Sequence, residues 1–394
     1  MASLTPQPMS PRPTYEEVLR LRAASAKQSA EKMAAAPAAA APANAPQPPP
    51  QPPHPPPPAA ASAPAPSPPA VAPAPVAAPA KPVAEPAFTD AEVEVLRTPL
   101  APSEWCGSEL HERALAYMRS RRDAAVLADP SLAPTVEMAS DLRLWRFLVA
   151  TAFKGGDAAS MYVEALRWRK RNGTDATRKD LRAANPSFFT ARATSLEKPL
   201  LTEQDAAVFA ARPRTFFTKS AGGGGELLLD RAGNLLFIEV PASADAAAVC
   251  ALGADAFLAS ELRTQELLQL VLDELSTRQD RLVLMFRVLD LAGVSLTPNP
   301  FRSSDVKKGE GLVKAAGKEV RDAYPTTTYK NCLINAPAAS IAGPIVAALV
   351  PKRSRDKTML LGKDYAGELH SFVAPSSLPK KLGGELDNGN QWKK

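Results

Sequence analysis

Residues 281–290, RLVLMFRVLD, limit the folds open to this chain more than any other stretch, because they are apolar at nearly every position. A strand with one face in water alternates apolar with polar residues, so an unbroken apolar strand is typical of a sheet covered on both faces. Shorter apolar runs and stretches of helical periodicity alternate around it. We predict strands at 214–218, 235–240, 330–335 and 357–361, and helices at 257–275, 305–324 and 338–349. Alternation at these lengths predicts an α/β domain with a mixed sheet.

The sequence before this domain has the pattern of packed helices. Apolar residues recur at spacings of three and four over 108–127 and 136–153, which predicts two core-facing helices. A third helix is expected to begin with Asp157 as its cap and to end at Asn172-Gly173, where glycine permits the left-handed conformation that closes many helices. We therefore expect a helical domain at 88–185 and the α/β domain at 186–390.

The N-terminal composition does not support a packed core. Of the chain's 41 prolines, 21 lie within residues 37–86, and no Asp, Glu, Lys or Arg occurs between Met33 and Ala80. Such Ala/Pro sequence buries too little apolar surface to offset the entropy lost on ordering. Residues 1–87 are therefore predicted to be a disordered extension rich in polyproline-II conformation.

The first residues allow two interpretations. Thr14 and Glu17 have the spacing of a capping box, which favours a short helix near 14–33. The Arg, Ala and Ser content after Leu19 also resembles an organelle transit peptide. Transit peptides are poor in acidic residues, so Glu16 and Glu17 favour the helix.

Charge and cysteine content narrow the function classes. The formal net charge of +6 suits an anionic membrane surface as well as nucleic acid. Three cysteines, far apart in sequence and without a C-x-x-C pair, indicate a reducing compartment and no zinc site. No apolar run approaches the roughly 18 residues that a bilayer-spanning helix needs, so any membrane contact is expected to be peripheral. We expect a cytoplasmic protein.

Several motifs in this chain follow one another in a recognisable order. They are LWRFL at 144–148, LRWR at 166–169, LDLAGVSL at 289–296, YP at 324–325, INAP at 334–337, LLG at 360–362 and LPKKLGG at 378–384. In this order and spacing they resemble the CRAL-TRIO lipid-binding family, which includes phosphatidylinositol transfer proteins and carriers of tocopherol and retinaldehyde. The resemblance covers about residues 140–385. It implies a sheet that forms the floor of a lipid cavity, with helices around it.

The resemblance also implies that the apolar helix at 338–349 is a gate that opens to admit lipid. Gly343-Pro344 weakens the backbone hydrogen bonds in the middle of this helix. An ordinary buried helix with a kink would have the same sequence pattern. The apolar residues assigned to the gate are Ile341, Ile345, Val346 and Leu349.

A basic loop follows the predicted gate. Lys352, Arg353 and Arg355 are placed where an anionic membrane surface would dock, although a solvated turn explains the same cluster. A second basic group, Lys307, Lys308, Lys314 and Lys318, is interpreted as a solvated helix face.

Carrying over the family's ligand residues predicts a partly retained headgroup site. Ser354 and Lys357 stand where phosphatidylinositol transfer proteins place a Thr and a Lys on the inositol phosphate. Thr151 replaces an expected Arg, and Thr326 and Thr327 replace Glu-Arg after the Tyr-Pro motif. These five residues are the headgroup candidates, together with Arg287.

The floor strands depart further from the family pattern. Phe237, Met285 and Arg287 stand where hydroxyl groups are expected for phosphatidylcholine, so the first two are predicted to line the cavity wall. Arg287 lies in an apolar strand, and a buried guanidinium needs an acidic partner. That partner is either Glu239, which we favour, or an acidic lipid headgroup.

Two patterns that suggest an enzyme have simpler explanations. Asp290 ends the apolar strand without a nearby His, Cys or Lys, which favours a carboxylate that satisfies turn amides over a catalytic base. The glycines at 222–225 are not followed by Lys-Ser or Lys-Thr, which favours a hairpin over a phosphate loop. A nucleophile elbow and a metal-ligand cluster are also missing from the sequence, so we expect no catalytic activity, no metal and no cofactor beyond a bound lipid.

The sequence thus predicts a protein that binds a phospholipid, for example phosphatidylinositol or a phosphoinositide, in a cavity and transfers or presents it between membranes. The expected partners are the lipid and an anionic membrane surface, and not nucleic acid. The alternative is a sensor of membrane lipids that recruits SH3 or WW domains through its Pro-rich extension without net transfer.

Overall fold

The computed structural model describes residues 83–97, 101–212, 214–215, 218–219, 224–294, 303–320, 323–325, 327–336 and 352–387. All described residues belong to one compact unit, Ala77–Lys394. The predicted N-terminal helix near 14–33 and the Pro-rich extension before residue 83 lie outside the described residues.

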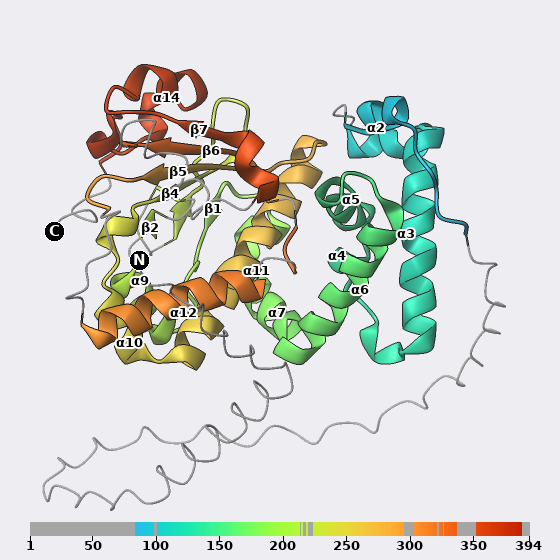
Figure 1. Ribbon diagram of the computed structural model, residues 1–394, viewed down its shortest axis with the longest axis horizontal. Helices are drawn as coiled ribbons and strands as arrows, with labels where there is room; N and C mark the ends of the chain where they lie inside the picture. The colour runs from blue at the N-terminus through green and yellow to red at the C-terminus, as the bar shows by residue number, and fades with distance from the viewer. Residues whose placement is uncertain are drawn as a thin grey trace, which may run out of the picture. The chain divides into compact units, whose positions relative to one another are not determined.

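A five-stranded mixed sheet is the centre of the α/β part (Figure 1). Its strand order is β2-β4-β5-β6-β7, in which β4 through β7 are parallel and β2 is antiparallel to β4. The strands are β2 (Arg214–Thr215), β4 (Leu235–Glu239), β5 (Met285–Asp290), β6 (Thr328–Ile334) and β7 (Thr358–Leu360). A separate antiparallel pair joins β1 (Ser195–Leu196) to β3 (Gly225–Glu226). The predicted α/β class with a mixed sheet is confirmed.

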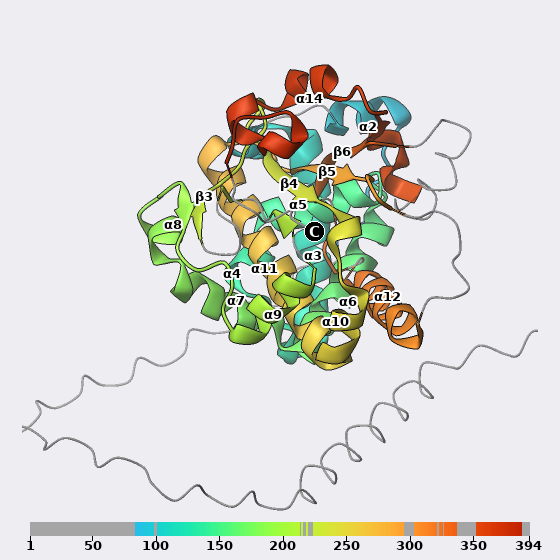
Figure 2. The same cartoon turned by 90° about the vertical axis from the view of Figure 1, so that its left-hand side faces the viewer.

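Both faces of the sheet are covered, as the unbroken apolar strand predicts (Figure 2). Leu236, Ile238 and Phe286 point to one face and pack with Leu369 of α14 (Ala366–Phe372). Leu235 and Phe237 point to the other face and pack against α11 (Ala254–Gln279). We name these the α14 face and the α11 face. Burying each such side chain contributes roughly 1.5–3 kcal/mol, so the two layers hold the sheet from both sides.

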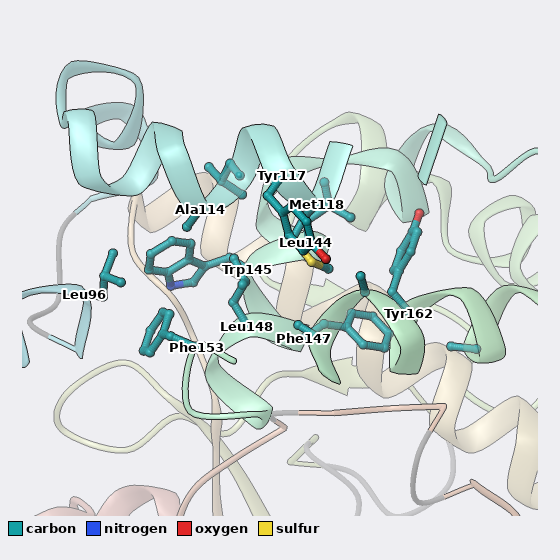
Figure 3. Packing of buried hydrophobic residues seen from close by; sticks show 14 of the residues in the cluster. Leu96, Ala114, Tyr117, Met118, Leu144, Trp145, Phe147, Leu148, Phe153 and Tyr162 are labelled. Carbon is teal, nitrogen blue, oxygen red and sulfur yellow. The ribbon is translucent and has the colours of Figure 1, made fainter. Parts of the chain in front are cut away.

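The helices before the sheet enclose a core of their own around Trp145 (Figure 3). Trp105 and Trp145 stack with ring centroids 4.8 Å apart, and Phe153 lies 5.3 Å from Trp145. The helices that enclose it are α2 (Asp90–Arg97), α3 (Glu109–Ala128), α4 (Val136–Ala139), α5 (Asp141–Ala150) and α6 (Gly155–Asn172). Two further helices, α7 (Thr174–Ala184) and α8 (Pro186–Thr190), add apolar residues to the cluster on the α11 face.

The remaining helices of the described ranges are α9 (Glu203–Ala211), α10 (Ala246–Leu252) and α12 (Ser304–Val320), which pack on α11 and on one another. The 3-10 turns η1 (Pro102–Gly107) and η2 (Pro130–Leu132) contact the helices before the sheet. The other 3-10 turns are η3 (Pro241–Ser243), η4 (Lys352–Lys357), η5 (Pro375–Ser377) and η6 (Lys380–Leu382). No helix within these described ranges is both long and apolar enough to cross a bilayer.

The single helix predicted over 136–153 is wrong, because α4 and α5 are separate. Ser140 between them has extended backbone (φ −66°, ψ 150°), and its hydroxyl accepts a hydrogen bond from the N–H of Arg143. Ser140 therefore caps a new helix instead of continuing the old one.

The predicted cap of α6 is also wrong. The helix begins at Gly155, two residues before Asp157. The N–H of Gly156 instead donates to Glu85 Oε1 at 2.6 Å, so a carboxylate 71 residues earlier satisfies this helix end. Gly173, with φ 63°, ends the helix in the left-handed conformation as predicted.

Candidate lipid-binding site

One row of side chains crosses the α11 face of the sheet at a single level. The strand register pairs Phe237 with Arg287, Arg287 with Asn331, and Asn331 with Thr358. Asn331 Nδ2 and Thr358 Oγ1 lie 3.4 Å apart. Because neighbours in register lie on the same face, the row places three polar side chains beside one aromatic ring.

Arg287 has the partner that the sequence favours. Its Nε donates to Glu239 Oε2 at 3.0 Å, and its Nη2 contacts the same oxygen. Glu239 Oε1 accepts from Arg212 at 2.9 Å, and Arg212 pairs with Glu261 of α11 at 3.2 Å. Arg287 and Arg212 thus share the Glu239 carboxylate, and Arg212 links it to Glu261.

Phe237 and Met285, the predicted cavity wall, are both buried on the α11 face, at 6% and 7% exposure. They belong to one apolar cluster with leucines of α11. Further along the same face, Leu289 and Leu333 form a second apolar cluster with Leu291. The polar row is therefore bordered by apolar side chains along the strands.

Two of the predicted headgroup residues are brought together at the N-terminal ends of the strands. Lys357 is exposed, and its Nζ donates to the carbonyl of Thr328 at 3.3 Å. Thr327, the preceding residue, accepts a hydrogen bond at its carbonyl from the N–H of Met285 at 2.7 Å. The starts of β5, β6 and β7 thus place the Lys357 ammonium next to the 327–328 segment.

Thr151 is engaged within its own helix end. It follows α5, and its hydroxyl lies 3.1 Å from the Phe147 carbonyl and 3.2 Å from the Leu148 carbonyl. These contacts satisfy the last carbonyls of the helix. Its assignment to the headgroup stays a prediction, and Thr151 cannot supply the positive charge of the Arg that it replaces.

The structure describes the predicted gate and the predicted membrane-docking loop only in part. The gate residues, Ile341, Ile345, Val346 and Leu349, and also Thr326, lie outside the described residues. The backbone of Lys352, Arg353 and Ser354 belongs to η4, whose exposed residues include Arg355. The assignments of the gate and of the docking loop stay predictions.

Asp290 organises the turn after β5. Its Oδ1 accepts hydrogen bonds from the N–H of Ala292 at 2.9 Å and from Asn335 Nδ2 at 2.7 Å. Asn335 has a left-handed backbone (φ 53°) at the end of β6. Asp290 therefore joins the ends of two adjacent strands. This agrees with the sequence, which favoured a carboxylate that satisfies turn amides over a catalytic base.

Sequence reasoning missed a buried network between α11 and the helices before the sheet. Four arginines, each at most 2% exposed, meet Glu266 and Asp273 of α11. The arginines are Arg143 and Arg146 of α5, Arg169 of α6 and Arg178 of α7. The spacing of Glu266, Gln269 and Asp273, three and four apart inside an apolar helix, is a signal that could have revealed it.

The buried arginines keep the carboxyl groups of Glu266 and Asp273 ionised. Burial by itself raises the pKa of a carboxyl group, but Arg169 and Arg178 hold the pKa of Glu266 below its usual value. Arg143, Arg146 and Arg178 have the same effect on Asp273. Burial also lowers the pKa of Arg143 to about 10, which still leaves it charged at neutral pH. The network is thus a set of buried ion pairs.

Comparison with known proteins adds little to this description. No protein-family model matches the chain, and no curated protein matches it. The solved structures that match include the crystal structure of Sfh5, which is 16% identical. That match covers 72% of this chain and 89% of the other, with a TM-score of 0.42. A likeness at this level assigns neither a family nor an activity, so we infer function from the residues themselves.

Proposed function

We propose that this protein binds a lipid in an internal cavity whose floor is the α11 face of the sheet, and that it moves or presents this lipid between membranes. A phosphorylated headgroup, with phosphatidylinositol as the favoured example, would lie beside Lys357. The observation that carries the proposal is the meeting of Lys357 with the 327–328 segment at the edge of this sheet face.

The chemistry of this edge supports a phosphate. Lys357 presents an exposed ammonium group, and Thr327 adds a hydroxyl-bearing side chain from the next strand. An ammonium with nearby hydroxyl donors is a common way to hold a phosphate oxygen. By contrast, Arg287 already shares Glu239 with Arg212, so it is a weaker candidate for an acidic headgroup.

The apolar part of the ligand requires an enclosed site. A two-chain lipid with about 30 methylenes costs roughly 25 kcal/mol to bring from a bilayer into water, at about 0.8 kcal/mol per methylene. A surface groove cannot offset this cost. Beyond the part of the sheet face that α11 covers, the apolar cluster that contains Leu289 and Leu333 would provide one wall of such a site.

Lipid extraction tests the proposal. The full-length protein is incubated with phosphatidylcholine vesicles that contain phosphatidylinositol, separated from them, and its bound lipid is identified by mass spectrometry. We expect Lys357→Ala to lower phosphatidylinositol binding about tenfold, because a hydrogen bond to a charged group contributes about 1.5–3 kcal/mol.

Lys363→Ala is the matched control, because Lys363 is also exposed but follows the opposite end of β7. Equal loss in both variants would reject a specific role for Lys357. A parent protein that binds neither lipid would reject the function itself.

The basic loop extends the proposal to the membrane. Lys352, Arg353 and Arg355 would attract an anionic surface at about 1 kcal/mol each. Movement of lipid between donor and acceptor vesicles separates a carrier from a sensor, because a sensor binds lipid without net transfer.

A further inference from the structure

Tyr324 connects the buried ion pairs of α11 to the sheet edge where Lys357 and Thr327 lie. We call this edge, where the lipid headgroup is proposed to bind, the headgroup edge. Its side chain is 5% exposed, and its hydroxyl donates to Glu266 Oε1 at 2.5 Å. The same carboxylate accepts from Arg169 and Arg178, so its position is determined by three donors from three different segments. Tyr324 is thereby tied to the middle of α11.

The ring of Tyr324 has a second fixed contact. It packs edge-on against Trp168 of α6, with ring centroids 5.6 Å apart and an interplanar angle of 83°. Trp168 Nε1 in turn donates to Glu319, near the end of α12, at 3.2 Å. Helices α6 and α11 therefore hold both the ring and the hydroxyl of Tyr324.

This anchor lies three residues before Thr327. Pro325 follows Tyr324 and restricts the backbone at φ near −65°. On the far side, the Thr327 carbonyl is held by the N–H of Met285, and the Thr328 carbonyl by Lys357. The described residues between α12 and β6 are thus held at Tyr324 and again at Thr327, where β6 meets its neighbours.

The Tyr324 hydroxyl is protonated, and therefore a donor, at neutral pH. Burial and the nearby Glu266 carboxylate raise the pKa of Tyr324 well above its usual value. Glu266 keeps Arg169 and Arg178 when the hydroxyl is removed, so loss of this one bond leaves no carboxylate without a cation.

We propose that Tyr324 is a positioning residue for the headgroup edge: through Glu266 it holds residues 323–325, and so sets Thr327 relative to Lys357. This inference rests on the proposed function. It predicts that losing the hydroxyl changes which lipid is selected and leaves the affinity for the acyl chains unaltered.

Tyr324→Phe tests this, with Tyr162→Phe as a matched control. Tyr162 is also buried, donates to the Met138 carbonyl at 2.9 Å and packs edge-on against Phe147. Each variant keeps its ring and loses one buried phenolic hydrogen bond, although the bond of Tyr324 is to a carboxylate and its loss should lower stability more. Only Tyr324 is connected to the headgroup edge.

Two measurements on the full chain decide the outcome. In extraction from mixed vesicles of phosphatidylcholine and phosphatidylinositol, Tyr324→Phe should lower the inositol-to-choline ratio of bound lipid about fivefold, and Tyr162→Phe should leave it unchanged. Amide hydrogen exchange in 323–334 should become faster only in Tyr324→Phe.

Equal lipid ratios in the two variants, or unchanged exchange in 323–334, would overturn the positioning role even if the parent extracts phosphatidylinositol. A parent that extracts neither lipid would overturn the proposed function, and this inference with it.

Discussion

At the first turn of α3, His111 has an environment that disfavours its charged form. The side chain is completely buried, and its ring stacks on Trp145 with centroids 4.8 Å apart. Nδ1 lies 2.8 Å from the Ser108 hydroxyl, and Nε2 has no hydrogen-bond partner in the structure. Burial lowers the pKa of His111 below its usual value of 6.5. A proton on this ring would be a buried charge without an acidic partner.

We predict that His111 makes the folded state less stable in mild acid. Because its pKa is lower in the folded chain than in the unfolded one, stability is unaffected above pH 6.5 and falls as the pH drops below that value. His111→Phe keeps a ring next to Trp145 but cannot titrate. Urea unfolding at pH 7 and at pH 5 should show a smaller loss of stability in the variant than in the parent. If the variant loses as much stability between pH 7 and pH 5 as the parent, titratable groups other than His111 cause the loss.

Two contacts of single polar side chains show what could and could not be expected from the sequence. Arg287 needed an acid, and Glu239 lies within two positions of its register partner on the neighbouring strand. Strand alternation puts both residues on one face, which agrees with the favoured pairing, and the structure shows that their two strands are neighbours. The contact of Glu85 with the start of α6 was not predictable, because no periodicity relates residues 71 positions apart.

At the scale of elements, the two ends of α6 show the difference between local and distant signals. Its C-terminal end follows from Gly173, whose left-handed backbone (φ 63°) is a property of the residue itself. Its start depends on Glu85, which reaches it only in the folded chain. The predicted strands of the five-stranded sheet exist, but their ends differ: β7 (Thr358–Leu360) is one residue shorter at each end than predicted, whereas β6 (Thr328–Ile334) begins two residues before the predicted start.

A pair of glycine substitutions tests this account of helix ends. Gly173→Ala should lower the free energy of unfolding by about 1–2 kcal/mol, because the left-handed backbone conformation is unfavourable for alanine. A steric clash is not the cause, since no atom lies within 4 Å of the new Cβ. Gly311→Ala lies inside α12, where nothing lies within 4 Å either, and should stabilise by about 0.5–1 kcal/mol. Denaturant unfolding measures both. The same sign for the two substitutions would contradict the conformational explanation.

At the scale of the described molecule, α11 joins the sheet to the helices that precede it. Its apolar residues, including Leu268 and Leu272, pack on the sheet, whereas Glu266 and Asp273 pair with arginines of α5, α6 and α7. Figures 1 and 2 both show α11 beneath the sheet, with α14 on the opposite face. The helix thus carries an apolar and an ionic contact surface at once.

We predict that Asp273→Asn destabilises the protein by about 3–5 kcal/mol, since it leaves the buried Arg143, Arg146 and Arg178 without their shared acid. The control is Asp123→Asn, which breaks an exposed pair with Arg122 and should cost at most about 1 kcal/mol. Urea unfolding measures both. Comparable losses in the two variants would show that the buried network contributes no more than a surface ion pair.

The sequence by itself determined the α/β class, the core-facing strands and the left-handed end of α6, and it favoured Glu239 over a lipid headgroup as the partner of Arg287. These depend on residue type and on periodicities of 2 and 3.6, which are local properties of the chain. Only the tertiary structure decided which arginines meet Glu266 and Asp273, that Glu85 caps α6, and that Lys357 lies beside the 327–328 segment. Each of these joins residues far apart in sequence, and a buried charge takes whichever partner the packed helices and strands bring within reach.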